Sequence, residues 1–189
     1  MQTIRSFIAL PITAAIQKSA AGLVRRLSGE RDGIKWVPGE NLHLTLKFLG
    51  EVDNRELPKV CATVRDCCRG IPPFALEFRG AGAFPDPSRP RVVYAGIVEG
   101  GEVLRELVGR LEPALADLGF KPEPRDYVPH LTLGRTRGGS RRGAPEVGER
   151  IRAAADVELG SMLAEKVCLY ASFLDKTGPT YQVMDTIEL

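Results

Sequence analysis

An α+β fold is what the sequence predicts, and three observations support it. Stretches with the two-residue alternation of strands occur between stretches with the spacing of amphipathic helices. The strand-like stretches are short and bounded by turns rich in glycine and proline, which favours mixed or antiparallel sheets with helices on their outer faces. The tetrapeptide His-Leu-Thr-Leu begins at residues 43 and 130, so 87 residues apart in a chain of 189, which indicates two similar lobes around a shared cleft.

Strands and helices alternate along the first half of the chain. Thr3 to Leu10 is interpreted as a strand, and Pro11 is expected to open a helix because proline suits the first helical position. Apolar residues keep helical spacing from there as far as Leu27. The further elements predicted for this half are strands at 34–38 and 41–49 around the turn "PGEN", a helix at 54–69, and strands at 74–84 and 91–98 around the connection "PDPSRP".

The second half repeats this scheme. A helix is expected over 104–118, where six apolar residues recur at helical spacing, although Pro113 should kink or interrupt it. The elements predicted after it are the second HLTL strand at 130–135, a weaker helix at about 145–155, and strands at 157–163, 166–174 and 180–189. No linker rich in proline or serine divides the chain, so residues 1–189 are expected to form a single domain with two lobes.

Composition and charge exclude several classes of function. The apolar stretches are short, and the N-terminus lacks the basic lead and long apolar core of a signal peptide, so we expect a cytoplasmic protein with no membrane association. A formal net charge of +2 argues against a protein that coats nucleic acid nonspecifically. An anionic partner must therefore be bound locally. The candidate is the glycine-rich stretch 134–143, with Arg135, Arg137, Arg141 and Arg142, whose far end can also be read as a solvated loop.

The four cysteines are expected to be reduced thiols. None forms a CxxC pair, and three of them fall on one predicted helix, which is poor geometry for a disulfide framework. Cys61 and Cys68 fall on the apolar stripe of that helix and are expected to be small core residues, whereas Cys67 lies off the stripe. No spare apolar helix face stands out, so a monomer is expected.

The only two histidines of the chain, His43 and His130, each begin an HLTL motif. Side chains alternate between the two faces of a strand, so each histidine shares a face with the threonine two places later. Leu44, Leu46 and Phe48 of the first strand, and the two leucines of the second motif, are expected to point the other way into a core. A single strand histidine is more often a hydrogen-bonded core residue. Two matching faces, completed by Thr45 and Thr132, indicate a functional pair instead, since imidazole titrates near neutral pH and can act as an acid or a base.

A metal site is the main rival interpretation, and the ligand count argues against it. The chain has no third histidine, no CxxC and no HExxH motif, whereas a catalytic metal usually takes three protein ligands. The GxSxG nucleophile elbow, the Walker loop and the GxGxxG motif are absent as well. We therefore expect no metal and no other cofactor, and acid-base chemistry by two imidazoles that each have a hydroxyl beside them.

Two imidazoles suit an in-line displacement at phosphorus. One removes a proton from the attacking water or hydroxyl, and the other protonates the departing oxygen. Thr45 and Thr132 can donate hydrogen bonds to the non-bridging phosphate oxygens, and Arg135 can stabilise the negative charge of the transition state. A cyclic phosphodiester assists this chemistry through its ring strain, and the 2′,3′-cyclic phosphate at an RNA end is the commonest such group.

The motifs in their context, "NLHLTLKFLGEV" and "PHLTLGR", resemble the paired motifs of the two-histidine (2H) phosphoesterase superfamily. Within it they are most similar to the RNA 2′,3′-cyclic phosphodiesterases once called 2′-5′ RNA ligases (LigT/ThpR). The resemblance covers nearly the whole chain, with "RSFIALP" similar to the first strand of the family, "RVVYAG" to its central strand, and "LYAS" and "TYQV" to its closing hairpin. It implies a bilobal 2H phosphoesterase fold, with two pseudo-symmetric lobes of mostly antiparallel sheet, outer helices and a central cleft.

The resemblance also implies roles for individual residues. His43 and His130 correspond to the catalytic histidines, Thr45 and Thr132 to phosphate ligands, and Arg135 to a phosphate-binding arginine. The implied reaction is metal-independent hydrolysis of RNA 2′,3′-cyclic phosphate ends to a 2′-phosphomonoester. His43 would act as the acid on the 3′ oxygen and His130 as the base on water.

Several alternatives stay open at this point. The same site working in reverse would join RNA ends through a 2′-5′ linkage as a side activity, and a non-catalytic relative would only bind nucleotides or RNA ends. Phe7 lies on the first strand, and Tyr127 precedes the second histidine by three places. Either aromatic ring could stack on a nucleobase or serve only in packing.

Overall fold

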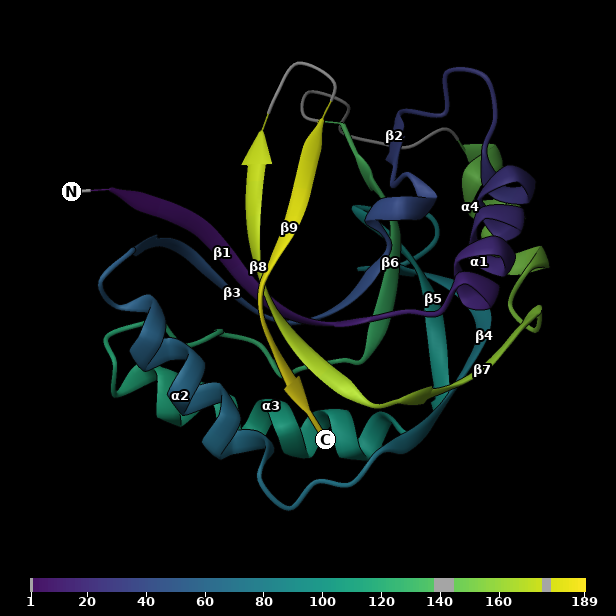
Figure 1. Ribbon diagram of the computed structural model, residues 1–189. Helices are drawn as coiled ribbons and strands as arrows, with labels where there is room; N and C mark the ends of the chain where they lie inside the picture. Colours follow the sequence, from purple (N-terminus) through teal and green to yellow (C-terminus); the bar gives the residue numbers. More distant parts are fainter. Residues whose placement is uncertain (1, 138–144, 175–177) are drawn as a thin grey trace.

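The computed structural model describes residues 2–137, 145–174 and 178–189 and folds into two antiparallel sheets with four helices (Figure 1). The strands are β1 (Thr3–Pro11), β2 (Ile34–Trp36), β3 (His43–Asp53), β4 (Phe74–Phe84), β5 (Val92–Glu99), β6 (His130–Thr136), β7 (Glu158–Ala164), β8 (Lys166–Leu174) and β9 (Pro179–Glu188). The helices are α1 (Ala14–Leu27), α2 (Leu57–Cys68), α3 (Gly101–Ala116) and α4 (Pro145–Ala153), with a short 3-10 turn at Gly39–Asn41. The predicted α+β class is therefore confirmed.

Both sheets combine strands from the two halves of the chain. The first sheet has the order β3-β1-β8-β9, and the second has the order β2-β6-β5-β4-β7. Each of two helices packs against the sheet that does not contain the strand before it (Figure 1). Helix α1 follows β1 of the first sheet but packs on β7 of the second sheet and on α4. Helix α3 follows β5 of the second sheet and packs on β3 of the first sheet and on α2. Neither half of the chain completes a sheet alone.

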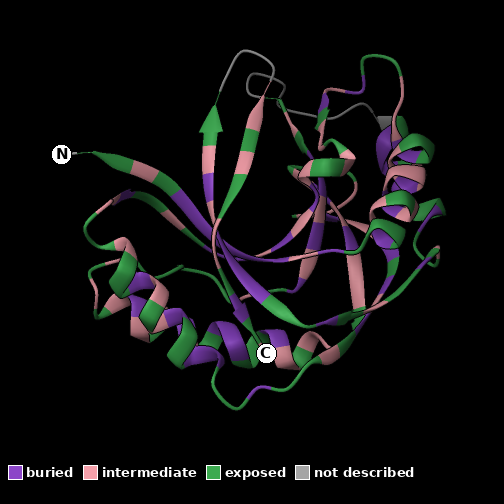
Figure 2. Ribbon diagram, in the orientation of Figure 1, coloured by how far each residue is buried: buried purple, intermediate pink, exposed green. Residues whose placement is uncertain are grey.

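The core lies between the sheets and these helices. The central strand β1 is buried through Ile8, Ala9 and Leu10, and the middle parts of its neighbours are buried as well, whereas the outer faces of α1 and α2 are exposed (Figure 2). The leucines of both HLTL motifs point into this core, as the alternation predicts: Leu44, Leu46, Leu131 and Leu133 are at most 4% exposed. Each of these leucines stabilises the fold by about 1.5–3 kcal/mol. The prediction that Phe48 also points into the core is wrong, since its side chain is 57% exposed. The pairing of β1 with β3 shifts register between Ile8 and Ala9, and this irregularity interrupts the alternation so that Lys47 is buried and Phe48 is exposed.

Two sequence-based predictions about proline need correction. Pro11 does not open the first helix; it is the last residue of β1, where it faces His43 of β3. The helix begins at Ala14, and Thr13 caps it by accepting a hydrogen bond from the backbone N–H of Ile16 (3.4 Å). Pro113 does not interrupt α3, which continues past it to Ala116, so the helix tolerates the loss of one backbone N–H donor near its end.

The cysteines of α2 are buried in a different pattern from the one predicted. Cys67 and Cys68 are buried and Cys61 is only half-buried, so the buried stripe of the helix is Val60, Val64, Cys67 and Cys68. The reason is that α2 packs against α3, where the Cys67 thiol donates to the backbone carbonyl of Arg110 (3.5 Å). All four cysteines are free thiols. Within the described residues, no helix is long and apolar enough to cross a membrane.

Candidate active site

The two histidine strands lie side by side where the sheets meet. β3 is an edge strand of the first sheet and β6 is next to the edge of the second, and the two are in contact. Each strand begins at its histidine. Sequence positions 87 residues apart are thereby brought to the junction of the two lobes.

Each histidine is held by the backbone of its own approach segment. The Nδ1 atom of His43 lies 2.7 Å from the carbonyl oxygen of Asn41, and the Nδ1 atom of His130 lies 2.7 Å from the carbonyl oxygen of Val128. A carbonyl oxygen can only accept a hydrogen bond, so Nδ1 carries the proton in both rings. Nε2 is left as the nitrogen that can exchange a proton with a ligand.

The electrostatic surroundings of the two rings are alike. Burial lowers the pKa of His43 below its ordinary value of 6.5, the Asn41 carbonyl opposes this, and the positive charge of Arg135 adds to the lowering. Burial likewise lowers the pKa of His130, opposed by the Val128 carbonyl and reinforced by Arg135. A single guanidinium therefore acts on both imidazoles, which places both within its electrostatic range.

The His43 ring is packed among aromatic side chains of the first sheet. Its centroid lies 4.7 Å from that of Phe7 on β1, 5.1 Å from that of Tyr181 on β9 in an edge-on arrangement, and 6.2 Å from that of Tyr170 on β8. Burial raises the pKa of Tyr181, and the charges of Arg135 and Arg5 oppose this rise. The aromatic packing fixes the orientation of the imidazole beyond what one hydrogen bond achieves.

The His130 ring meets a smaller aromatic group of the second sheet. Phe84 and Tyr94 stack on each other with centroids 4.4 Å apart, and His130 stands edge-on to both at 5.0 and 5.6 Å. The Tyr94 ring lies directly over the backbone of β4 at Gly82, where a Cβ atom would come within 2.6 Å of the Tyr94 hydroxyl. Glycine at residue 82 therefore makes room for the support of the second histidine.

A cavity of about 790 Å³ opens beside these strands. Of the predicted site residues, it is lined by Thr45 from β3, by His130, Thr132 and Arg135 from β6, and by Tyr127 from the segment before β6. His43 is not among the residues that line it. The structure thus brings Thr45, Thr132, Arg135 and His130 to a single cavity. His43 does not line this cavity and is packed among its aromatic neighbours.

Arg135 is exposed at the end of β6 and is positioned by the neighbouring strands. It pairs with Val92 of β5 on one side and Lys35 of β2 on the other. The preceding Gly134 allows β2 to approach closely, because a Cβ atom there would lie 2.9 Å from the Trp36 ring. Trp36 is in turn held by the carboxylate of Asp32, which accepts a hydrogen bond from its indole N–H (2.8 Å).

The two aromatic candidates differ from each other in this structure. Phe7 is 3% exposed, and its ring contacts those of His43 and Tyr170, so in this structure it packs against its neighbours and offers little surface on which a nucleobase could stack. Tyr127 lines the cavity while its hydroxyl donates to the backbone carbonyl of Thr45 (3.1 Å). Tyr127 therefore connects the second lobe to the strand of the first histidine.

Sequence reasoning missed the aromatic residues around the histidines. Tyr94, Tyr170 and Tyr181 occur within the stretches compared with the family, but nothing in their spacing shows that they converge on His43 or His130. Arg141 and Arg142 of the predicted cationic loop lie outside the described residues. Within the described ranges, no group of three His, Cys, Asp or Glu side chains is arranged to hold a metal ion.

Comparison with known proteins agrees with this geometry. The family model described as "LigT like Phosphoesterase" matches the chain twice, at residues 10–94 and 97–181. A Methanothermobacter thermautotrophicus protein named RNA 2′,3′-cyclic phosphodiesterase is 39% identical over 98% of this chain and 99% of its own. A Thermotoga maritima protein of the same name is 33% identical over 95% of this chain and 92% of its own.

Solved structures resemble the whole molecule as well. The structure of Escherichia coli LigT complexed with 3′-AMP matches with a TM-score of 0.80 and 25% identity, covering 100% of this chain and 99% of that one. A Thermus thermophilus protein matches with a TM-score of 0.79 and 28% identity over 98% of both chains. The duplicated family match covers most of the sequence and contains one HLTL strand in each copy, and the chain therefore belongs to the LigT-like phosphoesterase family.

Proposed function

We propose that this protein hydrolyses 2′,3′-cyclic phosphates at RNA ends and leaves a 2′-phosphomonoester. The observation that carries the proposal is the pair of imidazoles with matching Nδ1 anchors, both under the influence of one arginine that lines a cavity together with two threonines. Relatives at 33 and 39% identity bear the name of this activity, and LigT of Escherichia coli has been crystallised with a nucleotide, which supports the same substrate class.

The proposed reaction needs two proton transfers. Water attacks phosphorus and loses a proton to the Nε2 atom of one histidine, while the bond from phosphorus to the 3′ oxygen breaks and that oxygen takes a proton from Nε2 of the other histidine. The product carries a 2′-phosphate and a 3′-hydroxyl, and a second proton exchange with water restores the pair. Because the two imidazoles supply both transfers, no step requires a metal.

The other cavity residues would act on the charge of the phosphate. Thr45 and Thr132 lie on the histidine faces of their strands and line the cavity, and they would donate hydrogen bonds to the two non-bridging oxygens. Arg135 would stabilise the additional negative charge of the transition state. Burial together with this positive charge lowers the pKa of both histidines and keeps them neutral in the free protein at pH 7. The negative charge of a bound phosphate would raise the pKa of the histidine that acts as the acid and favour its protonated form.

We assign His130 as the base on water and His43 as the acid on the 3′ oxygen. His130 lines the cavity from which water would approach, whereas His43 is set back among Phe7, Tyr170 and Tyr181. Exclusion of water around His43 favours transfer of its proton to the leaving oxygen over transfer to solvent.

The activity is tested with an RNA oligonucleotide that ends in a 2′,3′-cyclic phosphate, in buffer containing EDTA. We expect a product whose terminal phosphate is removed by phosphatase, which leaves a diol sensitive to periodate, and which before that treatment co-migrates with a 2′-phosphate standard and not with a 3′-phosphate standard. Alanine at either His43 or His130 should reduce the rate by about 10²–10⁴-fold, the range for loss of a general acid or base. Unchanged hydrolysis by His43→Ala would falsify the mechanism, and dependence on added metal would contradict its metal-free form.

The assignment of acid and base is tested with a substrate whose bridging 3′ oxygen is replaced by sulfur. A thiolate leaves without protonation, so this substrate should restore much of the rate of His43→Ala and little of the rate of His130→Ala. The opposite pattern of rescue would exchange the two roles and leave the activity itself intact.

We further propose that residues 1–189 work as one bilobal domain, as a monomer in the cytoplasm. Interleaving of strands from both halves in each sheet supports the single domain. The free thiols support a reducing compartment. Light scattering at the concentrations used for the assay should give the mass of one chain, 20.6 kDa, and a dimer mass would overturn the monomer.

A further inference from the structure

The residue two places before each histidine differs between the two halves of the chain. It is Asn41 in the first half and Val128 in the second. The two family matches begin at residues 10 and 97, the same offset of 87 residues that separates the histidines, so Asn41 and Val128 occupy equivalent places in the duplicated unit. Both backbone carbonyls accept a hydrogen bond from Nδ1 of the histidine (2.7 Å), but only Asn41 has a side chain that can donate a hydrogen bond.

The Asn41 carbonyl lies beyond the part of β3 that pairs with β1. The pairing of the two strands ends at Pro11 and His43, and Pro11 has no backbone N–H to donate. Asn41 belongs to the 3-10 turn before β3, where its own N–H donates to the carbonyl of Pro38 (2.9 Å). The ladder with β1 therefore stops short of the residue whose carbonyl holds His43.

Strand β9, from the other end of the chain, anchors the Asn41 side chain. The Nδ2 amide of Asn41 donates a hydrogen bond to the backbone carbonyl of Pro179 (2.9 Å), the first residue of β9. Two places further along β9, the Tyr181 ring stands edge-on to the His43 imidazole, with the ring centroids 5.1 Å apart. Strand β9 thus contacts both the residue that holds His43 and the imidazole that is held.

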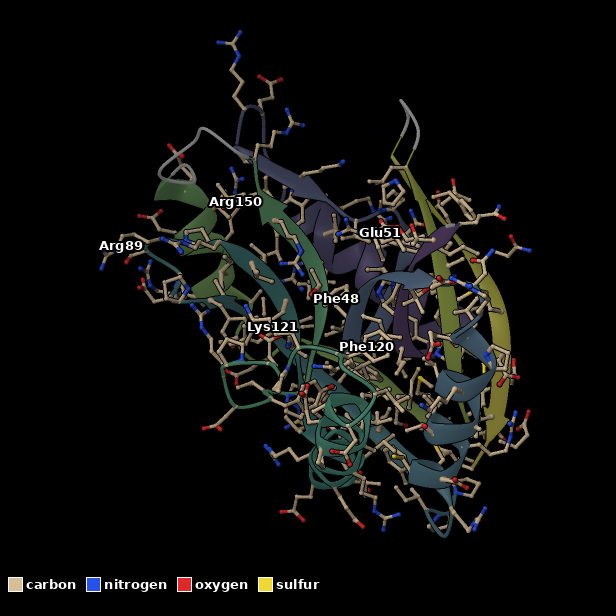
Figure 3. The ribbon with its side chains drawn as sticks, turned by 90° about the vertical axis from the view of Figure 1, so that its left-hand side faces the viewer. Phe48, Glu51, Arg89, Phe120, Lys121 and Arg150 are labelled. Carbon is tan, nitrogen blue, oxygen red and sulfur yellow. The ribbon has the colours of Figure 1, made fainter. Side chains whose placement is uncertain are left out.

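This anchor lies outside the cavity that is proposed to hold the phosphate. Asn41, Pro179 and Tyr181 are not among the residues that line the cavity. Figure 3 shows β8 and β9, in yellow, at the right-hand side of the molecule, to one side of the cavity residue Phe48. An effect of the Asn41 amide on the reaction would therefore pass through His43 and not through contact with the ligand.

We propose that Asn41 is a positioning residue for His43, and that its amide acts by tying the turn before the first histidine to β9. The catalytic consequence rests on the proposed function. While the amide is bonded to Pro179, the Asn41 carbonyl stays at Nδ1 and the imidazole keeps one orientation, as a group that transfers a proton requires. Val128 cannot form a corresponding tie for the second histidine, because its side chain has no donor.

The kinetic test uses Asn41→Ala, which removes the amide donor. Its kcat for an RNA 2′,3′-cyclic phosphate should fall about 5- to 50-fold, since a small misplacement of a reacting group has an effect on this scale, and KM should stay nearly unchanged. The substrate with sulfur in place of the bridging 3′ oxygen is the second arm. Across the two substrates Asn41→Ala should follow the pattern of His43→Ala at smaller amplitude, so the proposed acid role predicts rescue by sulfur. The ratio of the two rates is measured on one preparation, so an unfolded fraction cancels.

Ring-proton NMR gives a second readout that does not depend on activity. Burial lowers the pKa of His43, the hydrogen bond to the Asn41 carbonyl raises it, and the charge of Arg135 lowers it further. Asn41→Ala should loosen the bond to the carbonyl, so the His43 titration should move to lower pH. The His130 titration should stay in place, because its carbonyl partner is Val128.

Arg65→Gln is the matched control. It removes a different contact to β9, the ion pair of the exposed Arg65 with Asp185 (3.0 Å), and should leave the rate ratio and both histidine titrations unchanged.

The outcomes separate this inference from the function on which it rests. A pattern of rates for Asn41→Ala unlike that of His43→Ala would overturn the positioning role and leave the phosphodiesterase activity standing. An unmoved His43 titration, or an equal shift of both histidines, would overturn it as well. If the wild-type protein hydrolyses no cyclic phosphate, the proposed function fails, and the His43 titration still decides whether Asn41 holds the imidazole.

Discussion

The two HLTL strands are alike as far as the second leucine and differ in the two residues that follow. His43 and His130 have the same Nδ1 anchor at the same distance, and the leucines of both motifs are buried. After the leucines, β3 continues with Lys47 and Phe48, whereas β6 continues with Gly134 and Arg135. The shared part holds the groups proposed for proton transfer, and the divergent part faces different surroundings in each lobe.

Lys47 and Gly134 serve different structural tasks at equivalent places. Lys47 is 4% exposed, and its ammonium group forms an ion pair with Glu112 of α3 (2.8 Å) and donates to the carbonyl of Lys121 (2.9 Å). Gly134 has no side chain and lets Trp36 of β2 pack on β6. The first motif is therefore joined to a helix that comes from the other half of the chain, and the second is joined to a strand that comes from the other half.

The difference between the two strands after their HLTL motifs explains how a nearly symmetric site can bind an asymmetric ligand. In a 2′,3′-cyclic phosphate the 3′ oxygen leaves phosphorus and the 2′ oxygen stays bound to it. The ribose and its base lie on one side of the phosphate only. Two identical half-sites would bind it in two orientations. Divergence at Phe48 and Arg135 places a phenyl ring and a guanidinium at equivalent positions of the cavity lining, and this difference would select one orientation.

Among the changes that separate the two half-sites, the largest expected effect comes from Arg135→Gln. Loss of its charge should lower kcat about 10²–10³-fold, as expected when one transition-state donor is removed. The pKa of both histidines should rise, because Arg135 contributes to lowering each of them. Since kcat/KM requires one neutral and one protonated imidazole, its maximum in the free wild-type protein should lie below the ordinary histidine pKa of 6.5 and should move to higher pH in the variant. Ring-proton NMR follows both titrations without ambiguity, as the chain has only two histidines.

Arg137→Gln provides the comparison for this variant. Arg137 lies two residues further along, just after β6, and its charge acts on Asp32 and is not a cause of the shift at either histidine. It should leave both histidine titrations in place. If Arg135→Gln shifts only one of the two histidines, the arginine is not shared, and the comparison between the half-sites must be redrawn.

The second largest expected effect is a loss of stability in Lys47→Met. Removal of the ammonium group leaves the Glu112 carboxylate, which is 23% exposed, without its partner. Breaking a buried pair costs about 3–5 kcal/mol, and we expect about 3 kcal/mol because Glu112 keeps some access to water and still accepts a hydrogen bond from the Glu123 N–H (3.1 Å). Urea unfolding at pH 7 measures the change in the free energy of unfolding.

The double variant Lys47→Met/Glu112→Leu is the control for this effect. It removes both charges and should recover most of the lost stability, since an apolar pair is often as stable as the ion pair it replaces. A double variant no more stable than Lys47→Met would show that the lysine acts mainly through its hydrogen bond to the Lys121 carbonyl.

Much of the fold was predictable because local patterns agree with the final structure. The strand at β6 and the helix at α3 follow from alternation and from helical spacing, since those patterns arise from burial of one face. The start of α1 was wrong because Pro11 remains in the ladder beside His43 and Thr13 is the better cap. The placement of β2 and β4 in the sheet of the second half was not predictable, because pairing between distant strands leaves no local signal.

The site was predictable only in part, for a similar reason. The rarity of histidine and its repeated context indicated His43, Thr45, His130 and Thr132 as a group, and the structure brings three of them to one cavity. The burial of Phe7 beneath His43 and the ion pair of Lys47 depend on contacts between elements far apart in the sequence. No spacing within a strand reveals such contacts.

The smallest expected effect concerns the link between the lobes. The Tyr127 hydroxyl donates to the carbonyl of Thr45, and among the described residues no side chain makes the corresponding bond to the carbonyl of Thr132. Tyr127→Phe should lower stability by about 1 kcal/mol, the net contribution of one hydrogen bond, and should lower kcat a few-fold if the bond positions the Thr45 hydroxyl.

Double variants decide whether Tyr127 acts through that threonine. In a Thr45→Val background the hydroxyl is already absent, so Tyr127→Phe should have no further effect on kcat, although its effect on unfolding should persist. In a Thr132→Val background its effect on kcat should remain in full. Equal effects in both backgrounds would mean that Tyr127 supports the cavity as a whole, and the two threonines would then be equivalent despite the hydrogen bond from Tyr127 to the Thr45 carbonyl.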